Sequence, residues 1–100
     1  MTKKAEKMVV TYTERLEINA TYFITNAVSF NKEAGKLDKE YDFTKGFLKE
    51  IQKTFIDMIR GMYRFCMISE KDFDELYTKS NDIYNEIFEK MLDAYVEAKY

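Results

Sequence analysis

The sequence predicts an all-α fold, an elongated antiparallel three-helix bundle with up-down-up connectivity. The 100 residues include three glycines and no proline, so the residues that most often form turns are scarce. Apolar residues recur at steps of three and four through three long segments, as they do on one face of a helix. One hundred residues is also the size of one small domain, and we expect residues 1–100 to form a single helical domain.

The first predicted helix extends from about Thr2 to Ala34, and Gly35 is expected to end it. Residues 16–24 also alternate between apolar and polar side chains as a strand would. A helix is preferred, because no turn signal divides residues 8–34 and a strand of that length would be unusual. The residues expected on its buried face are Ala5, Val9, Tyr12, Leu16, Ala20, Phe23, Ala27, Phe30 and Ala34.

The second predicted helix extends from about Phe43 to Met67 and follows a polar link over residues 35–42. Asp42 or Thr44 is expected to cap its start, because short polar side chains accept hydrogen bonds from the free amides of a helix N-terminus. Its expected buried face consists of Leu48, Ile51, Phe55, Met58, Met62 and Phe65, with Phe47, Ile59 and Cys66 beside it.

The third predicted helix has Ser69 as its N-cap, with Asp72 three residues later in a variant of the capping box. Ile68 and Phe73 occupy the two positions of a hydrophobic staple. Helices of 25 to 30 residues are roughly 40 Å long, which predicts an elongated molecule. The short link before Ser69 favours an antiparallel arrangement of the second and third helices. The expected buried face continues through Leu76, Tyr77, Ser80, Ile83, Tyr84, Ile87, Met91, Leu92 and Tyr95.

The composition excludes most catalytic and metal-binding machinery. No histidine is present, so the chain has no Ser-His-Asp or Cys-His catalytic group and no His-ligated zinc. The single cysteine, Cys66, rules out a disulfide within the chain and is expected to be a structural thiol. The three glycines are isolated from one another, so no phosphate-binding loop is expected. We therefore expect no enzymatic activity, no cofactor and no metal.

The chain carries no recognisable targeting signal. Its first residues are basic, but no apolar run follows that could form the core of a signal peptide. The longest apolar clusters, such as residues 66–68, are too short to span a bilayer. A lone thiol fits a reducing compartment. These features lead us to expect a cytoplasmic protein with no membrane partner.

The last third of the chain is acidic, although the formal net charge of the whole is only −2. Residues 69–100 carry nine acidic and four basic side chains. A solvated face is the ordinary interpretation of such a pattern. The alternative is an acidic face that mimics a nucleic-acid backbone and occupies a basic groove on a partner protein. The carboxylates expected to project together, opposite the buried face, are Glu75, Asp82, Glu86, Glu89, Asp93 and Glu97.

The outer face of the second helix is the predicted partner-binding surface. Ile56 and Tyr63 lie in or beside a strip of basic residues, and Ile56 is expected to face water. Aromatic and arginine side chains are enriched at interface hot spots, so the mixture resembles an interface composition. The alternative is an ordinary charged face. The predicted binding residues are Lys49, Lys53, Ile56, Arg60, Tyr63 and Arg64.

A second candidate surface lies on the first helix. Ile18 and Tyr22 point away from its buried face, and Val10 and Val28 lie on a flank. A second apolar face on one helix suggests a further partner, either another copy of the chain in a homodimer or a different protein. The alternative is that the other two helices wrap the first one fully.

Together these features predict a non-enzymatic helical protein that acts by binding another protein. An inhibitor, an adaptor and a small subunit of a larger assembly all fit, and the inhibitors include the small accessory proteins that mobile elements use against host machinery. The acidic face suggests a nucleic-acid-binding protein as the partner. The rival hypothesis is that the basic strip itself binds nucleic acid by following phosphates. The net acidic charge opposes it, because carboxylates repel a polyanion.

Overall fold

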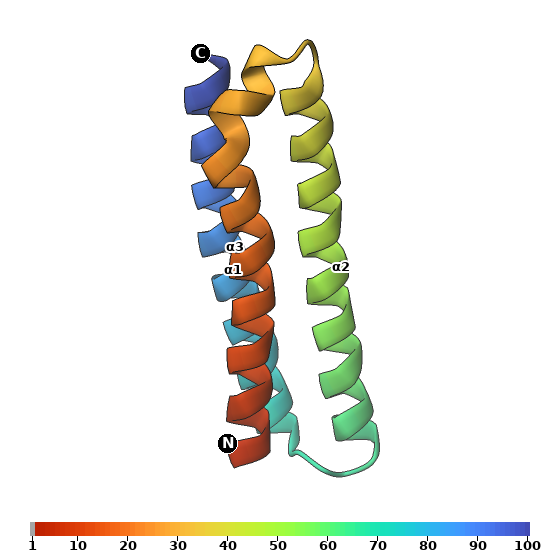
Figure 1. Ribbon diagram of the computed structural model, residues 1–100. Coiled ribbons are helices and arrows are strands. Elements are labelled where there is room, and N and C mark those ends of the chain that lie inside the picture. Colours follow the sequence, from red (N-terminus) through yellow and green to blue (C-terminus); the bar gives the residue numbers. More distant parts are fainter. Residues whose placement is uncertain (1) are drawn as a thin grey trace.

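The computed structural model describes residues 2–100, which form three helices packed side by side, each antiparallel to the one before it (Figure 1). Helix α1 covers Lys3–Lys32, α2 covers Lys36–Arg64 and α3 covers Glu70–Lys99, and no strand occurs within residues 2–100. The N-terminal end lies beside the α2–α3 connection, and the C-terminus lies beside the α1–α2 connection (Figure 1). All three helix pairs are in contact. The predicted three-helix bundle is confirmed.

The bundle is elongated, as its helix lengths require. Its extents are 51 × 16 × 16 Å and its radius of gyration is 15.8 Å, against about 13 Å for a compact domain of this size. A helix of 30 residues is about 45 Å long, so the helices set the long axis of the molecule. Among the residues that the structure describes, no helix is long and apolar enough to cross a membrane.

Helix α1 begins where the sequence predicts. Thr2 is its N-cap, and the Thr2 hydroxyl oxygen accepts a hydrogen bond from the Ala5 amide at 3.2 Å. All of the predicted buried residues are buried except Ala34, which lies beyond the last helical residue, Lys32. Gly35 has a φ of 71°, a left-handed conformation that glycine adopts without steric cost. It therefore separates α1 from α2.

Helix α2 starts earlier than predicted. Its first residue is Lys36, so the predicted polar link over residues 35–42 is helical for most of its length. The physical reason is that Leu37, Tyr41 and Thr44 extend the buried face at helical spacing. Leu37 and Thr44 are buried, and Tyr41 packs against the core. Thr44 is thus a core residue and not a cap.

The predicted buried face of α2 was wrong at two positions in its C-terminal half. Met58 and Phe65 are exposed, and Ile59 is fully buried in their place. The predicted buried residues are spaced, on average, by slightly less than the 3.6 residues of a helical turn. Their row therefore winds around the helix and turns away from the core toward its C-terminal end. Phe47, expected beside the buried face, is also exposed. The residues of α2 that are buried are Leu37, Thr44, Leu48, Ile51, Phe55 and Ile59.

The α2–α3 connection contains one correction and two confirmed predictions. Cys66, predicted to be a structural thiol, is exposed and has a φ of 56° just beyond the end of α2. Ser69 is the N-cap of α3, and its hydroxyl oxygen accepts a hydrogen bond from the Asp72 amide at 3.1 Å. Ile68 is buried and Phe73 packs against the core, as the predicted staple requires.

A single core runs along the bundle and contains contacts between all three helices. The Tyr12 ring of α1 stacks on the Phe55 ring of α2, with 4.5 Å between centroids. The Tyr12 hydroxyl also donates a hydrogen bond to the Ser80 carbonyl of α3 at 3.2 Å. On the predicted face of α3, Tyr77 and Leu92 are exposed. The largest hydrophobic side chains that are fully buried are Leu16, Phe23, Leu48, Ile59, Leu76 and Met91.

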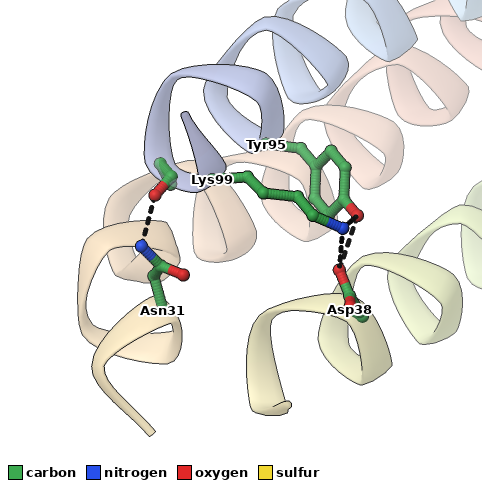
Figure 2. A network of polar contacts seen from close by, with 5 residues as sticks. Asn31, Asp38, Tyr95 and Lys99 are labelled. Carbon is green, nitrogen blue, oxygen red and sulfur yellow. Dashed lines mark hydrogen bonds and ion pairs between the residues drawn. The ribbon is translucent and has the colours of Figure 1, made fainter. Parts of the chain in front are cut away.

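A polar network joins the helices at the end of the bundle that carries the C-terminus (Figure 2). Asp38 of α2 accepts hydrogen bonds from the Tyr95 hydroxyl and, at 3.1 Å, from the Lys99 ammonium of α3. Asn31 of α1 donates a hydrogen bond to the Ala98 carbonyl of α3. The hydrogen bonds from Tyr95 and Lys99 lower the pKa of the Asp38 carboxyl below its usual value. Hydrogen bonds with Tyr95 and Asp38 raise the pKa of Lys99.

Candidate functional site

The predicted basic strip lies along the groove between α2 and α3. A hollow of about 420 Å³ opens there, and four of the six predicted binding residues line it. Side chains from α3 complete the hollow, although the sequence had assigned them to the core. We call this hollow and its margin the basic groove. Its lining residues are Lys49, Gln52, Lys53, Ile56, Asp57, Arg60, Tyr77 and Tyr84.

The other two predicted residues, Tyr63 and Arg64, lie nearer the α2–α3 connection and line a neighbouring hollow. The Tyr63 ring is 5.6 Å from the Phe73 ring, which is 6.1 Å from the Tyr77 ring. Tyr77 lines the basic groove, so this aromatic row links the two hollows. The six predicted residues therefore lie along one continuous surface.

The sequence predicted that Ile56 faces water. The structure corrects this prediction, because Ile56 is half-buried in the basic groove. It lies one helical turn beyond Gln52, whose amide donates a hydrogen bond to the Asn81 side chain of α3 at 2.7 Å. That contact shows that this side of α2 borders α3. A helix in a three-helix bundle packs against two neighbours, so its buried arc is wider than the single stripe on which the prediction was based.

The groove is basic at its margin and aromatic at its floor. Asp57 is its one acidic lining residue, and it pairs with Arg60 at 3.6 Å. Both side chains are exposed, so solvent weakens the pair. Tyr84 is buried. This burial is the main cause of the raised pKa of its hydroxyl, and the neighbouring Tyr41 is a smaller cause.

A second surface lies on the face shared by α1 and α2. Ile18 and Tyr22 are exposed on α1, as predicted. The structure adds Phe43, Phe47 and Met58, which are exposed on α2. These three residues were not predicted as surface residues, because the sequence pattern placed Phe47 and Met58 in or beside the core and Phe43 at the start of the helix. Phe43 and Phe47 are four residues apart and Phe47 and Met58 are eleven apart, a spacing that places all three on one side of a helix. This spacing could have indicated the surface.

The predicted acidic residues of α3 are all exposed. Lys90 approaches Glu86 at 3.8 Å, and none of the six carboxylates lines the basic groove. Within residues 2–100, no three acidic or thiol side chains converge as metal ligands. The six residues form an acidic row, which consists of Glu75, Asp82, Glu86, Glu89, Asp93 and Glu97.

Comparison of the chain with protein-family models, curated proteins and solved structures gives no significant match. A functional hypothesis must therefore come from the surfaces that the molecule itself presents. These are the basic groove between α2 and α3, the apolar face across α1 and α2, and the acidic row of α3.

Proposed function

We propose that the protein is not an enzyme and acts by binding another protein through the basic groove. The observation that carries this proposal is the placement of Lys53, Arg60 and Tyr77 around one hollow formed by two helices. Interface hot spots are enriched in tyrosine and arginine and cluster in pockets that exclude water. An inhibitor, an adaptor or a small subunit of a larger assembly would each use such a surface.

The chemistry of the groove favours an acidic segment of the partner that carries one apolar or aromatic anchor. Cationic side chains surround a floor that includes Ile56 and Tyr84. The cations would steer an acidic segment toward the groove through complementary potential. The apolar floor would then bury the anchor, and the Tyr84 hydroxyl would supply a hydrogen bond. Such burial is the main source of affinity at hot spots.

The test is affinity capture with the tagged full chain from an extract of the organism that encodes it, followed by mass spectrometry. The decisive variant is Lys53→Glu/Arg60→Glu, in which both altered residues are exposed. The matched control is Lys32→Glu/Lys79→Glu, which makes the same charge change at exposed residues outside the groove. We expect a captured protein that the groove variant loses and the control variant keeps. A partner that both variants keep would contradict the proposed surface.

Nucleic-acid binding through the same cations is the rival function. Heparin chromatography separates the two, because heparin retains proteins that bind polyanions through lysine and arginine. The net charge of −2 and the exposed acidic row lead us to expect elution at low salt. Strong retention that the Lys53→Glu/Arg60→Glu variant abolishes would favour the rival.

A further inference from the structure

The α1–α2 face holds exposed apolar side chains that neither the core nor the basic groove uses. Ile18 and Tyr22 lie one turn apart on α1, and Phe43 and Phe47 lie one turn apart on α2. Met58 continues the row on α2 and borders residues of α1 in a shared hollow. Single exposed apolar residues are ordinary. Five on one face form an unpartnered surface.

One end of this face is basic. A hollow of about 400 Å³ lies between the N-terminal half of α1 and the C-terminal half of α2. Lys4, Lys7 and Arg15 line it, and no carboxylate does. Its floor is apolar and includes Phe55 and Met58. We call it the basic hollow.

The other end of the face is acidic. A second hollow, of about 420 Å³, lies on the N-terminal half of α2. Asp42 and Glu50 line it together with Phe43, Gly46 and Phe47, and no cation does. We call it the acidic hollow. The middles of the two hollows are about nine residues apart along α2, which corresponds to roughly 13 Å along the helix.

We propose that the α1–α2 face binds a second copy of the chain in an antiparallel dimer with two-fold symmetry. A two-fold axis that lies in the interface and runs across the helices reverses the bundle end for end. The basic hollow of each copy then lies over the acidic hollow of the other. Phe43 and Phe47 of each copy lie over the apolar floor of the opposite basic hollow, and Asp42 and Glu50 lie among its cations. Each contact occurs twice.

The charge pattern selects this arrangement over the alternatives. In a parallel dimer, each basic hollow would meet the other basic hollow and each acidic hollow the other acidic hollow, which is repulsive. An acidic helix from an unrelated protein would complement the basic hollow but would repel Asp42 and Glu50. A second copy in the antiparallel orientation satisfies both ends of the face at once.

The long side of the molecule has room for a stable dimer contact. The extents of 51 × 16 Å give this side a projected area of about 800 Å², so a contact along most of its length would reach the area that each partner contributes to a standard-size interface. Apolar side chains in the middle of the contact and charged side chains around them match the usual anatomy of an interface. The basic groove between α2 and α3 does not share a lining residue with either hollow. The proposed dimer contact therefore uses none of the residues that line the basic groove.

Sedimentation velocity of the full chain over a wide concentration range tests the dimer. We expect a species of twice the 12.0 kDa chain mass. Phe47→Ser should weaken the dimer by at least about tenfold, as loss of a central aromatic anchor does. The matched control is Val96→Ser on α3, because Val96 is 46% exposed and Phe47 is 47% exposed. The control should dimerise like the wild type.

Charge-reversed variants test the antiparallel orientation. Lys7→Glu/Arg15→Glu makes both ends of the face acidic, and Asp42→Lys/Glu50→Lys makes both ends basic. Each variant alone should be monomeric, because its copies repel at both ends. A mixture of the two should dimerise, because every acidic hollow then meets a basic one. Circular dichroism of each variant should match that of the wild type, since all four altered residues are exposed.

The proposal is overturned if the wild type stays monomeric at every concentration. It is also overturned if both charge variants dimerise as well as the wild type, or if Phe47→Ser leaves the dimer unchanged. None of these results would bear on capture of a partner by the basic groove, so the two proposals stand or fall separately.

Discussion

Replacing Phe23 by alanine should remove a large share of the free energy of unfolding. Phe23 is 0% exposed on α1. Its ring lies 5.8 Å from the Tyr41 ring of α2, in an edge-on contact, and 6.1 Å from the Phe30 ring. Alanine at this position would lose both aromatic contacts and leave a cavity between the helices.

The expected loss follows from the burial of the ring. Phenylalanine-to-alanine changes in protein cores cost about 3–5 kcal/mol, because apolar contact is lost and the cavity closes only in part. The aromatic contact with Tyr41 spans two helices, so partial collapse cannot restore it. We therefore expect a loss near 4 kcal/mol. Domains of this size unfold with about 5–15 kcal/mol in total.

Urea denaturation followed by circular dichroism measures this loss, at a low protein concentration where self-association does not contribute. The matched control is Phe43→Ala, the same chemical change at a residue that is 65% exposed. We expect the control to change the free energy of unfolding by less than about 0.5 kcal/mol. Equal losses for the two variants, or a loss below about 1 kcal/mol for Phe23→Ala, would refute the assignment of the α1 core face.

Three further predictions concern single contacts. Ser69→Ala should lower the free energy of unfolding by about 1 kcal/mol, because it removes the N-cap of α3; no loss in urea denaturation would mean that α3 begins elsewhere. Tyr12→Phe should cost about 0.5–1.5 kcal/mol through loss of the hydrogen bond to the Ser80 carbonyl. Burial raises the pKa of Tyr12 above the usual tyrosine pKa of about 10. The wild type should therefore lose stability as the pH rises above about 10, because the unfolded chain releases this proton first. The Tyr12→Phe variant should lose less stability over that range. The hydrogen bond from Tyr95 lowers the pKa of Asp38. The Asp38 carboxylate therefore stabilises the fold above the usual aspartate pKa, and this stabilisation is lost as the pH falls below about 4. Thermal unfolding of the Asp38→Asn variant should depend less on pH across that acidic range.

The start of α3 could be predicted because the signals that define it are local. The Ser69 hydroxyl caps an amide three residues away, and Ile68 is buried in the core against which Phe73 packs. The buried face of α1 was equally accessible to prediction, because its apolar residues keep helical spacing over about seven turns. Such patterns depend on the chain near each residue and need no knowledge of which helix packs where.

The start of α2 could not be predicted from local signals. Residues 36–42 are mostly polar, and their helical state is stabilised by Leu37 and Tyr41, which pack against the core. Tyr41 lies 4.2 Å from the ring of Tyr95, more than fifty residues later in the chain. Contacts between distant segments of this kind override a weak local preference.

The candidate binding surface could be predicted only as a strip on one helix. The residues from α2 follow from helical spacing, but the groove exists because α3 lies beside them and contributes Tyr77 and Tyr84. The same neighbour half-buries Ile56. For that reason exposed charges, and not Ile56→Asp, make the cleaner test of binding. The acidic and basic hollows on the other face likewise depend on how α1 and α2 pack.

Site-specific photo-crosslinking tests the proposed binding surface most directly. A photoreactive residue replaces Lys53 in the basic groove, and the same residue replaces Lys79, which is exposed on α3 outside the groove. Both proteins are irradiated in extract from the organism that encodes the chain, and adducts are identified by mass spectrometry. We expect an adduct with one partner protein at position 53 and none with that protein at position 79. An adduct with that partner at position 79 and none at position 53 would contradict it.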